Sequence, residues 1–351
     1  MRRTFLRRTG ALAAAAALTS VVGALTLTLW PTATAHAQAA PAAPAKPTAP
    51  QPFTLAGWSK PITEITHLLV EEEKGFFRSE GLALNYLPGA GGGDALRNLL
   101  SGQADIAFTD PGSFFAALDK GEKLRAVYDI YPQNVFNVVS LPASNIRKPA
   151  DLKGKRVGVY SLSSGTLQNL QILLQQAGLK KDDVTVVVTG LLNFAPLIQG
   201  QVDATAATDT GLALARRRGV RDPQVIEVGD YLNYSSDILV VRESTYQQNK
   251  EVLRRFLAGY RRSAQWMIDQ PAEAAQLAVK RAIDGQDPAL NREIIDIRNR
   301  SAVSPLTKER GLGTLDEKSL QAAADAYRKL GLIERDIRIR DVIGTDLLPA
   351  R

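Results

Sequence analysis

One stretch of this sequence occurs twice, first as Leu99-Leu-Ser-Gly-Gln-Ala-Asp-Ile-Ala-Phe-Thr-Asp110 and again as Leu197-Ile-Gln-Gly-Gln-Val-Asp-Ala-Thr-Ala-Ala-Thr-Asp209. Both copies contain Gly-Gln-x-Asp, beginning at Gly102 and at Gly200, and the second copy has one additional residue before its final Thr-Asp. Each copy reads as a helix that ends at glycine, a tight turn at aspartate and a short buried strand. The repeat therefore predicts two lobes of similar build.

Short β-type runs alternate with helical patterns on both sides of the repeat. Strands are predicted over residues 53–57, 82–87, 106–109, 156–160 and 184–188, and helices over 65–77, 252–268, 289–300 and 316–330. Pro271 stops the helix that ends at residue 268. Alternation of this kind is typical of parallel sheets covered by helices, so the predicted fold class is α/β.

Two apolar segments predict where the chain passes between the lobes. The run from Tyr131 to Ser140 ends at a proline-containing turn, and the run from Asp237 to Arg242 fits the return. Two crossings insert one lobe into the other. The prediction is two Rossmann-like lobes joined by a two-crossing hinge, with lobe 1 over residues 53–142 and 238–351 and lobe 2 over 143–237.

The amino-terminal segment is typical of an export signal. A basic start, Met1 to Arg8, precedes a charge-free apolar run from Ala11 to Leu29, and Ala35-His36-Ala37 matches a cleavage pattern. The length of the run also fits a membrane anchor, but its alanine-rich composition and the cleavage pattern favour a signal peptide over residues 1–37. The paired arginines leave both the general and the twin-arginine export routes open. Residues 38–52 are rich in alanine and proline and predict an extended linker.

Composition limits the function further. The chain has no cysteine, which excludes disulfides, thiolate metal sites and a lipid-attachment cysteine, so a periplasmic protein without a lipid anchor is expected. Residues 1–37 hold four arginines and no acidic residue, so their removal lowers the formal net charge from +7 to +3. A charge this small gives no reason to expect a nucleic-acid partner.

Three stretches of the chain resemble the type II periplasmic binding proteins of the sulfonate, nitrate and thiamine-precursor group. They run from Trp58 to Leu82 with Glu73-Lys74-Gly75-Phe76-Phe77, across Gly102 to Asp105, and from Pro149 to Val159 with Asp-Leu-Lys-Gly-Lys-Arg-Val-Gly-Val. The resemblance implies two lobes that close on a small molecule and a monomer that delivers it to a membrane permease of the ABC type. No Gly-x-x-x-x-Gly-Lys-Ser/Thr loop is present, so the ATPase is expected to be a separate chain.

Ligands of open α/β sheets bind at the carboxyl ends of strands, and the loops at those positions predict the site. Trp58 can stack on a flat ligand. The backbone amides of glycines before a helix can bind an oxygen of the ligand. Ser/Thr hydroxyls at the start of a helix can bind the ligand or simply cap the helix. The matched final residues of the repeat, Asp110 and Asp209, are expected to face each other across the cleft. The predicted ligand-binding residues are Trp58, Lys60, Gly92, Gly93, Asp110, Tyr131, Ser163, Ser164, Thr166, Asn193 and Asp209.

Two carboxylates and an indole favour a flat ligand that carries amino groups, such as an aminopyrimidine or another heteroaromatic compound. A sulfonate or nitrate, the alternative, would need arginine, and none of the predicted loops contains one. No cofactor, metal or catalytic residue is predicted. With His67 as the one histidine after export and no cysteine, Cys-His catalysis and multi-histidine metal sites are excluded by count, and no Gly-x-Ser-x-Gly elbow supports a serine triad.

Two other functions stay open. Thiamine-pyrimidine synthases share the fold that the resemblance implies, but they depend on a cysteine-rich motif that is absent here. A ligand sensor docked to a signalling receptor needs the same closing cleft as a transport protein, so only the neighbouring genes would separate these two roles.

Overall fold

The structure is a computed structural model that describes residues 49–348. The predicted signal peptide and most of the predicted linker lie outside the described residues. The first strand, β1 (Gln51–Ala56), includes the last two residues of the predicted linker.

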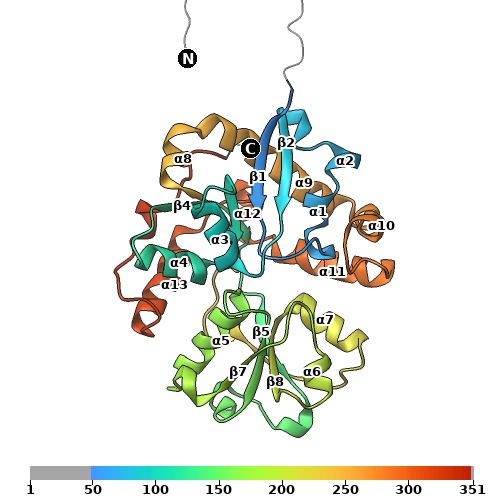
Figure 1. Ribbon diagram of the computed structural model, residues 1–351, viewed down its shortest axis with the longest axis vertical. Helices are drawn as coiled ribbons and strands as arrows, with labels where there is room; N and C mark the ends of the chain where they lie inside the picture. The colour runs from blue at the N-terminus through green and yellow to red at the C-terminus, as the bar shows by residue number, and fades with distance from the viewer. Residues whose placement is uncertain (1–48, 349–351) are drawn as a thin grey trace, which may run out of the picture. The chain divides into compact units, whose positions relative to one another are not determined.

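Two five-stranded sheets form the framework of the described residues, one in each lobe (Figure 1). In the first sheet the order is β2-β1-β3-β10-β4, and in the second it is β7-β6-β8-β5-β9. In both sheets the fourth strand runs antiparallel to its two neighbours, whereas the first three strands are parallel. The remaining strands are β2 (Leu82–Leu87), β3 (Ile106–Thr109), β4 (Leu124–Tyr131), β5 (Phe136–Ser140), β6 (Arg156–Val159), β7 (Thr185–Val188), β8 (Ala204–Thr208), β9 (Gln224–Glu227) and β10 (Asp237–Arg242). The expected α/β class with two lobes of similar build is confirmed.

The chain passes between the sheets twice, but the first passage comes earlier than predicted. Strand β5 pairs with β8 and β9, so residues 136–142 belong with the second sheet and the predicted boundary at residue 142 is wrong. The crossing lies between Tyr131 and Phe136. An apolar run reads the same in either lobe, and only its pairing partners decide where it belongs. The return passage leads into β10 at Asp237.

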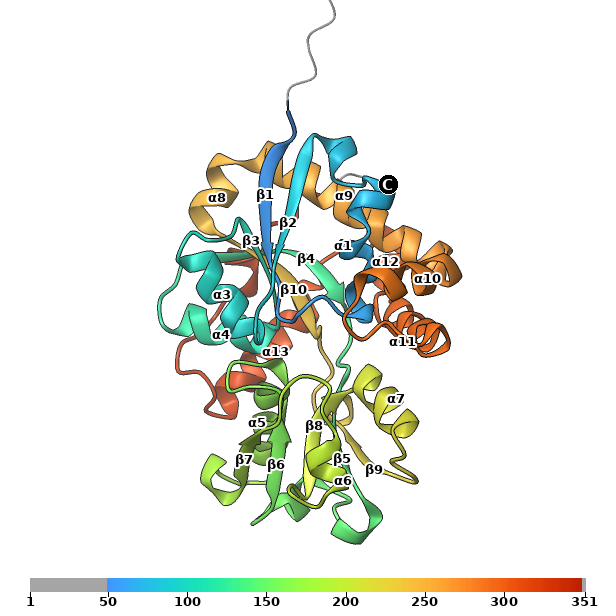
Figure 2. The same ribbon diagram turned by 45° about the vertical axis from the view of Figure 1, so that its right-hand side comes forward.

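Helices cover both sheets and the carboxyl-terminal ones lie with the first (Figure 2). One predicted helix, over 65–77, is instead two short helices, because the first ends at Val70 and the second ends at Gly75 in the left-handed conformation. The helices are α1 (Thr66–Leu69), α2 (Glu71–Lys74), α3 (Gly92–Leu100), α4 (Pro111–Asp119), α5 (Gly165–Gln176), α6 (Ala195–Ile198), α7 (Asp209–Arg217), α8 (Glu243–Gln248), α9 (Lys250–Asp269), α10 (Pro271–Arg281), α11 (Pro288–Ser301), α12 (Pro305–Arg310) and α13 (Glu317–Lys329).

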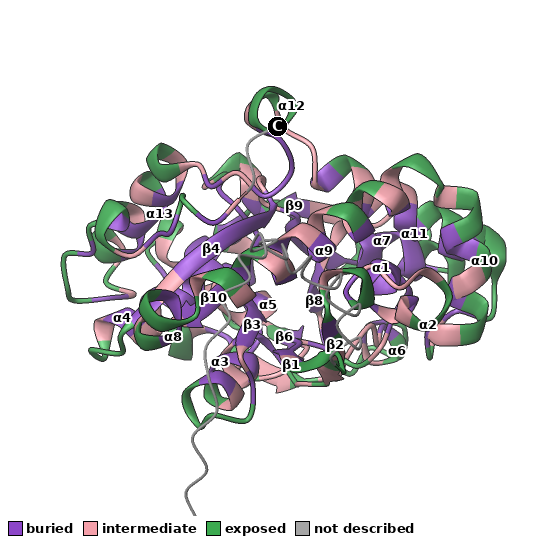
Figure 3. Cartoon of the chain, turned by 90° about the horizontal axis from the view of Figure 1, so that it is seen from above, coloured by how far each residue is buried: buried purple, intermediate pink, exposed green. Residues whose placement is uncertain are grey.

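Burial follows this layered arrangement, with the inner strands of the sheets buried and the outer faces of the helices exposed (Figure 3). Strands β3 and β5 show the pattern best, since all of their residues are buried. Within residues 49–348, no helix is long and apolar enough to cross a membrane.

The sequence repeat corresponds to the same turn in both lobes. Asp105 Oδ2 accepts a hydrogen bond from the Thr54 N–H of β1 at 2.7 Å, and Asp203 Oδ2 accepts one from the Arg156 N–H of β6 at 2.8 Å. In each lobe the glycine at the end of the helix has a positive φ, which is 81° for Gly102 and 69° for Gly200. The two aspartates therefore tie equivalent helix-turn-strand units to equivalent central strands.

Replacing Asp105 by alanine is expected to lower the free energy of unfolding by about 1–3 kcal/mol, because the partly buried Thr54 N–H loses its side-chain acceptor. Asp105→Asn is the matched control, since its amide oxygen can still accept this bond. Urea denaturation would measure both variants. Equal stability of the alanine variant and the unmodified protein would contradict this role of the turn.

Candidate functional site

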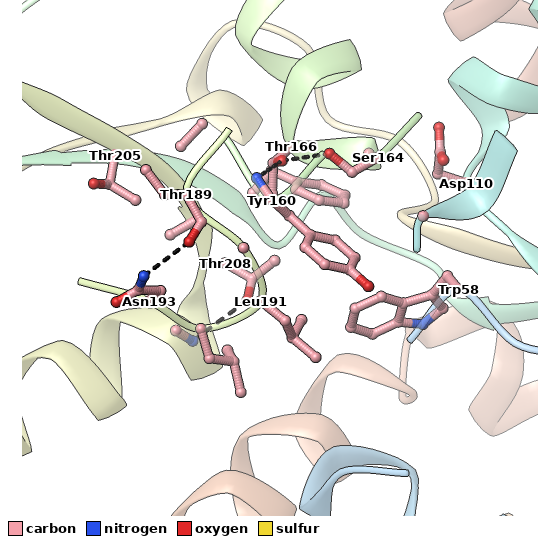
Figure 4. Close-up of a pocket in the computed structure, with 18 of the residues that line it drawn as sticks. Trp58, Asp110, Tyr160, Ser164, Thr166, Thr189, Leu191, Asn193, Thr205 and Thr208 are labelled. Atoms are coloured by element: carbon pink, nitrogen blue, oxygen red, sulfur yellow. Dashed lines mark hydrogen bonds between the residues drawn. The ribbon is translucent and has the colours of Figure 1, made fainter. Parts of the chain in front are cut away.

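A pocket opens between the two lobes, at the carboxyl ends of strands from both sheets (Figure 4). Six of the predicted ligand-binding residues line it, namely Trp58, Gly92, Asp110, Ser164, Thr166 and Asn193. Five do not: Lys60, Gly93, Tyr131, Ser163 and Asp209. The enclosed space is about 70 Å³, whereas a cavity that holds benzene measures about 150 Å³. A ring-sized ligand therefore needs lining side chains to move outward or the lobes to part slightly.

Three aromatic side chains form one wall of the pocket. Trp58 follows β1, Tyr160 follows β6, and Phe136 begins β5. The ring centroids of Trp58 and Tyr160 are 6.3 Å apart with their planes at 78° (Figure 4). Phe108 also packs edge-on against the indole, with the ring centroids 6.4 Å apart. Aromatic walls of this kind bind flat rings by stacking and edge contacts.

Hydroxyl and amide groups of the second lobe also line the pocket. The hydroxyls of Ser164 and Thr166 are 2.7 Å apart, and the Thr166 hydroxyl accepts a hydrogen bond from the Tyr160 N–H at 3.1 Å. The Asn193 side chain donates to the Thr189 carbonyl at 2.8 Å. Thr205 differs from the others, because its buried hydroxyl has no partner among the described residues. It offers a free polar group to a ligand.

Three carboxyl groups of the first lobe line the pocket, those of Glu64, Asp110 and Asp237. Asp110 is the N-cap of α4, and its carboxylate accepts hydrogen bonds from the Ser113 N–H and O–H, both at 2.8 Å. Burial raises the pKa of Asp110, although the Ser113 bonds oppose the shift. Burial, with the neighbouring Asp110, raises the pKa of Asp237 well above its usual value. Asp237 thus keeps a proton to higher pH than an exposed aspartate, and in that form it can both donate and accept.

An arginine of the carboxyl-terminal region, Arg298 of α11, completes the floor of the pocket and is 1% exposed. Its Nη1 lies 2.7 Å from Asp209 Oδ1 and its Nε lies 3.2 Å from Glu64 Oε2, as close ion pairs without hydrogen-bond alignment. Its Nη2 donates to the Thr210 hydroxyl at 3.0 Å, and that hydroxyl donates to Glu64 at 2.7 Å. Burial opposes the charge of Arg298, but Asp209 and Glu64 outweigh it and raise the arginine pKa. The cluster links lobe 1, with Glu64 and Arg298, to lobe 2.

Two predictions are corrected by this cluster. Asp209 does not face Asp110 across the cleft, because its carboxylate turns to Arg298. The predicted cleft loops contain no arginine, but the helix predicted over 289–300 supplies Arg298 to the pocket. The additional residue of the second repeat copy explains the first error: Thr208 is the N-cap of α7, so Asp209 is already inside the helix, whereas Asp110 is itself a cap.

The glycine-rich loop before α3 makes contacts between the lobes. The Gly93 N–H, predicted to hold a ligand, donates instead to the Ser163 carbonyl at 2.9 Å. The Ser163 hydroxyl donates to the Ala90 carbonyl at 3.0 Å, and the Tyr160 hydroxyl donates to the Gly89 carbonyl at 3.1 Å. These bonds join lobe 1 to lobe 2 beside the pocket, so this loop stabilises the closed arrangement.

Gly91 lies at the tightest point of this contact. A Cβ atom there would stand 2.4 Å from the Ser163 carbonyl oxygen, and φ is +126°. We expect Gly91→Ala to weaken ligand binding by about tenfold or more, since the lobes can no longer close fully. Gly219→Ala is the control, because Gly219 also has a positive φ, of +96°, but no atom within 4 Å of the added Cβ. Calorimetric titration of both variants would decide; equal affinities would contradict the role of Gly91.

The remaining predicted residues lie outside the pocket. Lys60 lines an open groove at the mouth of the cleft. Tyr131 is buried behind Arg298, with its ring centroid 4.9 Å from the guanidinium carbon. Residues that sequence reasoning did not single out include Glu64, Tyr160, Phe136, Asp237 and Arg298. Asp237 and Phe136 could have been predicted from the sequence, because both lie at the ends of the segments that cross between the lobes and these ends reach the cleft.

The family described as NMT1/THI5 like matches residues 62–274 of the chain. Among curated relatives, the riboflavin-binding protein RibY of Chloroflexus aurantiacus is 23% identical over 91% of this chain and 93% of its own length. The formylaminopyrimidine-binding protein of Halalkalibacterium halodurans is 23% identical over 64% of this chain and 69% of its own length. A 4-amino-5-hydroxymethyl-2-methylpyrimidine phosphate synthase of Aspergillus parasiticus is 23% identical over 59% of this chain and 64% of its own length.

A solved structure shares the fold. The alkanesulfonate-binding protein SsuA of Xanthomonas axonopodis pv. citri, bound to MOPS, superposes with a TM-score of 0.68 at 18% identity. The superposition covers 85% of this chain and 99% of that protein. At this identity the likeness concerns the fold alone, which is that of a periplasmic binding protein.

Proposed function

Because the chain belongs to the NMT1/THI5-like family, we propose that it is an extracytoplasmic solute-binding protein for a flat heteroaromatic small molecule. The ligand is of the aminopyrimidine or flavin class, and it is held between the lobes without chemical change. The protein acts as a periplasmic monomer and delivers the ligand to an ABC permease with a separate ATPase. Relatives named for binding riboflavin and formylaminopyrimidine support this ligand class.

The composition of the pocket is the observation that carries the proposal. Trp58, Tyr160 and Phe136 present aromatic surface. The Thr205 hydroxyl has no hydrogen-bond partner among the described residues, and Asp237 lines the pocket with a raised pKa. A ring with amino and carbonyl substituents matches both features, because its faces stack and its edge donates and accepts hydrogen bonds.

Arg298 does not favour the alternative, a sulfonate or nitrate. Its guanidinium is already paired with Asp209 and Glu64, so the positive charge at the pocket floor is balanced. A bare anion would have to compete with two carboxylates for this one arginine.

Some relatives are named as pyrimidine phosphate synthases, which makes an enzyme the second candidate. The chain contains no cysteine, whereas the resemblance implies a cysteine-rich motif in those synthases. We expect any ligand to be recovered unchanged after incubation with the protein. Mass spectrometry of the released ligand would test this, and a converted product would contradict the proposal.

The ligand class is tested by thermal denaturation of the purified protein with riboflavin, 4-amino-5-hydroxymethyl-2-methylpyrimidine, an alkanesulfonate and nitrate. A ligand at 100 times its Kd adds about 2.7 kcal/mol to the free energy of unfolding. Stabilisation by a heteroaromatic compound is expected. Stabilisation by the sulfonate or nitrate alone would overturn the proposal.

Trp58→Ala is expected to weaken binding of the heteroaromatic ligand by about tenfold or more, because the ligand loses its stacking partner. Trp266→Ala is a matched control, since Trp266 is distant in the fold and packs on Phe76 of the first lobe. Calorimetric titration would give both affinities. Equal losses in the two variants would remove the stacking role of Trp58.

A further inference from the structure

A second cavity adjoins the pocket at the mouth of the cleft, and we call it the mouth groove. It measures about 720 Å³, and Tyr160, Gly190, Leu191 and Leu192 line both the groove and the pocket. The groove receives residues of lobe 1 around Lys60 and of lobe 2 at the end of α7, so it is complete only when the lobes are closed. A ligand larger than the pocket can extend into this adjoining space.

Three cationic side chains line the mouth groove. Lys60 is exposed and has no ion pair or hydrogen bond through its ammonium group among residues 49–348. Arg217 is 47% exposed and its Nε lies 3.8 Å from Glu293, which is a loose pair. Arg218 donates from Nη1 to the Leu192 carbonyl at 3.0 Å, which fixes its position beside the loop shared with the pocket. The groove therefore presents cationic hydrogen-bond donors whose positive charge is only partly balanced by ion pairs with carboxylates.

Two carboxylates also line the groove, and one oxygen of each accepts hydrogen bonds within the protein. Asp284 Oδ1 accepts from the Thr63 N–H at 2.8 Å and from its hydroxyl at 2.9 Å. Asp287 is the N-cap of α11 and accepts from the Ala289 and Leu290 N–H groups at 2.9 and 3.1 Å. One oxygen of each carboxylate is thus used within the protein, while Lys60 and Arg217 keep donors available.

The groove also has an apolar side. Ile283 is 55% exposed there, beside the partly buried Leu191 and Leu192. An apolar strip between an aromatic pocket and a group of cations suits a linker that carries a charged end. The pocket itself cannot bind that end as readily, because its one arginine is paired.

We propose that the ligand carries an anionic substituent, of the phosphate monoester class, which lies in the mouth groove against Lys60 and Arg217 while the ring occupies the pocket. The proposal rests on the proposed function, which places the ring in the pocket lined by Trp58, Tyr160 and Phe136. Charge-assisted hydrogen bonds to two cations favour the phosphorylated ligand over its unphosphorylated counterpart.

Matched ligand pairs test this inference. The pairs are 4-amino-5-hydroxymethyl-2-methylpyrimidine with its phosphate, and riboflavin with riboflavin 5′-phosphate, titrated calorimetrically at low ionic strength. At least one phosphate ester is expected to bind about tenfold or more tightly than its partner. Lys60→Glu and Arg217→Glu are expected to remove this preference and to leave the affinity for the unphosphorylated compounds within about twofold.

Lys153→Glu is the charge-matched control, because this exposed lysine precedes β6 at the end of the strand away from the cleft. It is expected to keep the phosphate preference. Equal binding within both pairs, or equal loss of preference in the control, would overturn the mouth groove and leave the proposed function standing. If no member of either pair binds the unmodified protein, the proposed function fails as well.

Discussion

Replacing Arg298 by methionine is expected to lower the free energy of unfolding by about 3–5 kcal/mol at neutral pH. The side chain is 1% exposed, and its removal leaves Glu64 buried with the Thr210 hydroxyl as its remaining polar partner. Asp209 contributes less to this cost, because its side chain is 34% exposed and water can solvate it. Urea denaturation of the variant would measure the loss.

Matched variants separate the buried charge from the lost packing. Glu64→Gln combined with Arg298→Met is expected to recover most of the stability, since the uncharged amide keeps the bond from Thr210. Burial already raises the pKa of Glu64, and loss of the opposing arginine raises it further. The defect of Arg298→Met should therefore shrink as the pH falls and Glu64 takes up a proton. A pH-independent defect, or no recovery in the double variant, would contradict this explanation.

The framework of the fold was largely predictable because it depends on local patterns. The repeat marked by Asp105 and Asp203 predicts two equivalent units, and the structure contains the same bond from each aspartate to its central strand. The lobe of β5 (Phe136–Ser140) was not predictable in this way. Its apolar run would suit a buried strand in either sheet, and only long-range pairing decides.

The site was predictable where it follows strand ends and unpredictable where it depends on packing between distant segments. Trp58 and Asn193 come directly after strands, so their position at the cleft follows from the topology. Arg298 stands on an ordinary amphipathic helix, and nothing in its local sequence separates it from an exposed arginine. Its place in the pocket results from the packing of α11 against Glu64 and α7.

The second large effect is expected on the pH dependence of stability, and it arises from Asp129 of β4. This residue is 1% exposed. Its Oδ1 accepts a hydrogen bond from the Ser235 hydroxyl at 2.6 Å, and its Oδ2 has no partner among the described residues. Burial raises the pKa of Asp129 to about 7, with the Ser235 bond opposing the shift and Asp316 adding to it. In the unfolded chain an aspartate titrates near 3.9.

The folded protein therefore binds more protons than the unfolded chain between about pH 4 and pH 7, and its stability falls as the pH rises through this window. The contribution of Asp129 is on the order of 4 kcal/mol, at 1.36 kcal/mol for each pKa unit. The Asp129→Asn variant cannot ionise at this position. Between pH 4 and pH 8 its free energy of unfolding should therefore fall less than that of the unmodified protein, by roughly the contribution of Asp129. Ser235→Ala removes the opposing hydrogen bond and should extend the loss of stability to higher pH. Urea denaturation at several pH values would compare the three proteins, and parallel profiles would show that Asp129 stays ionised in the folded state.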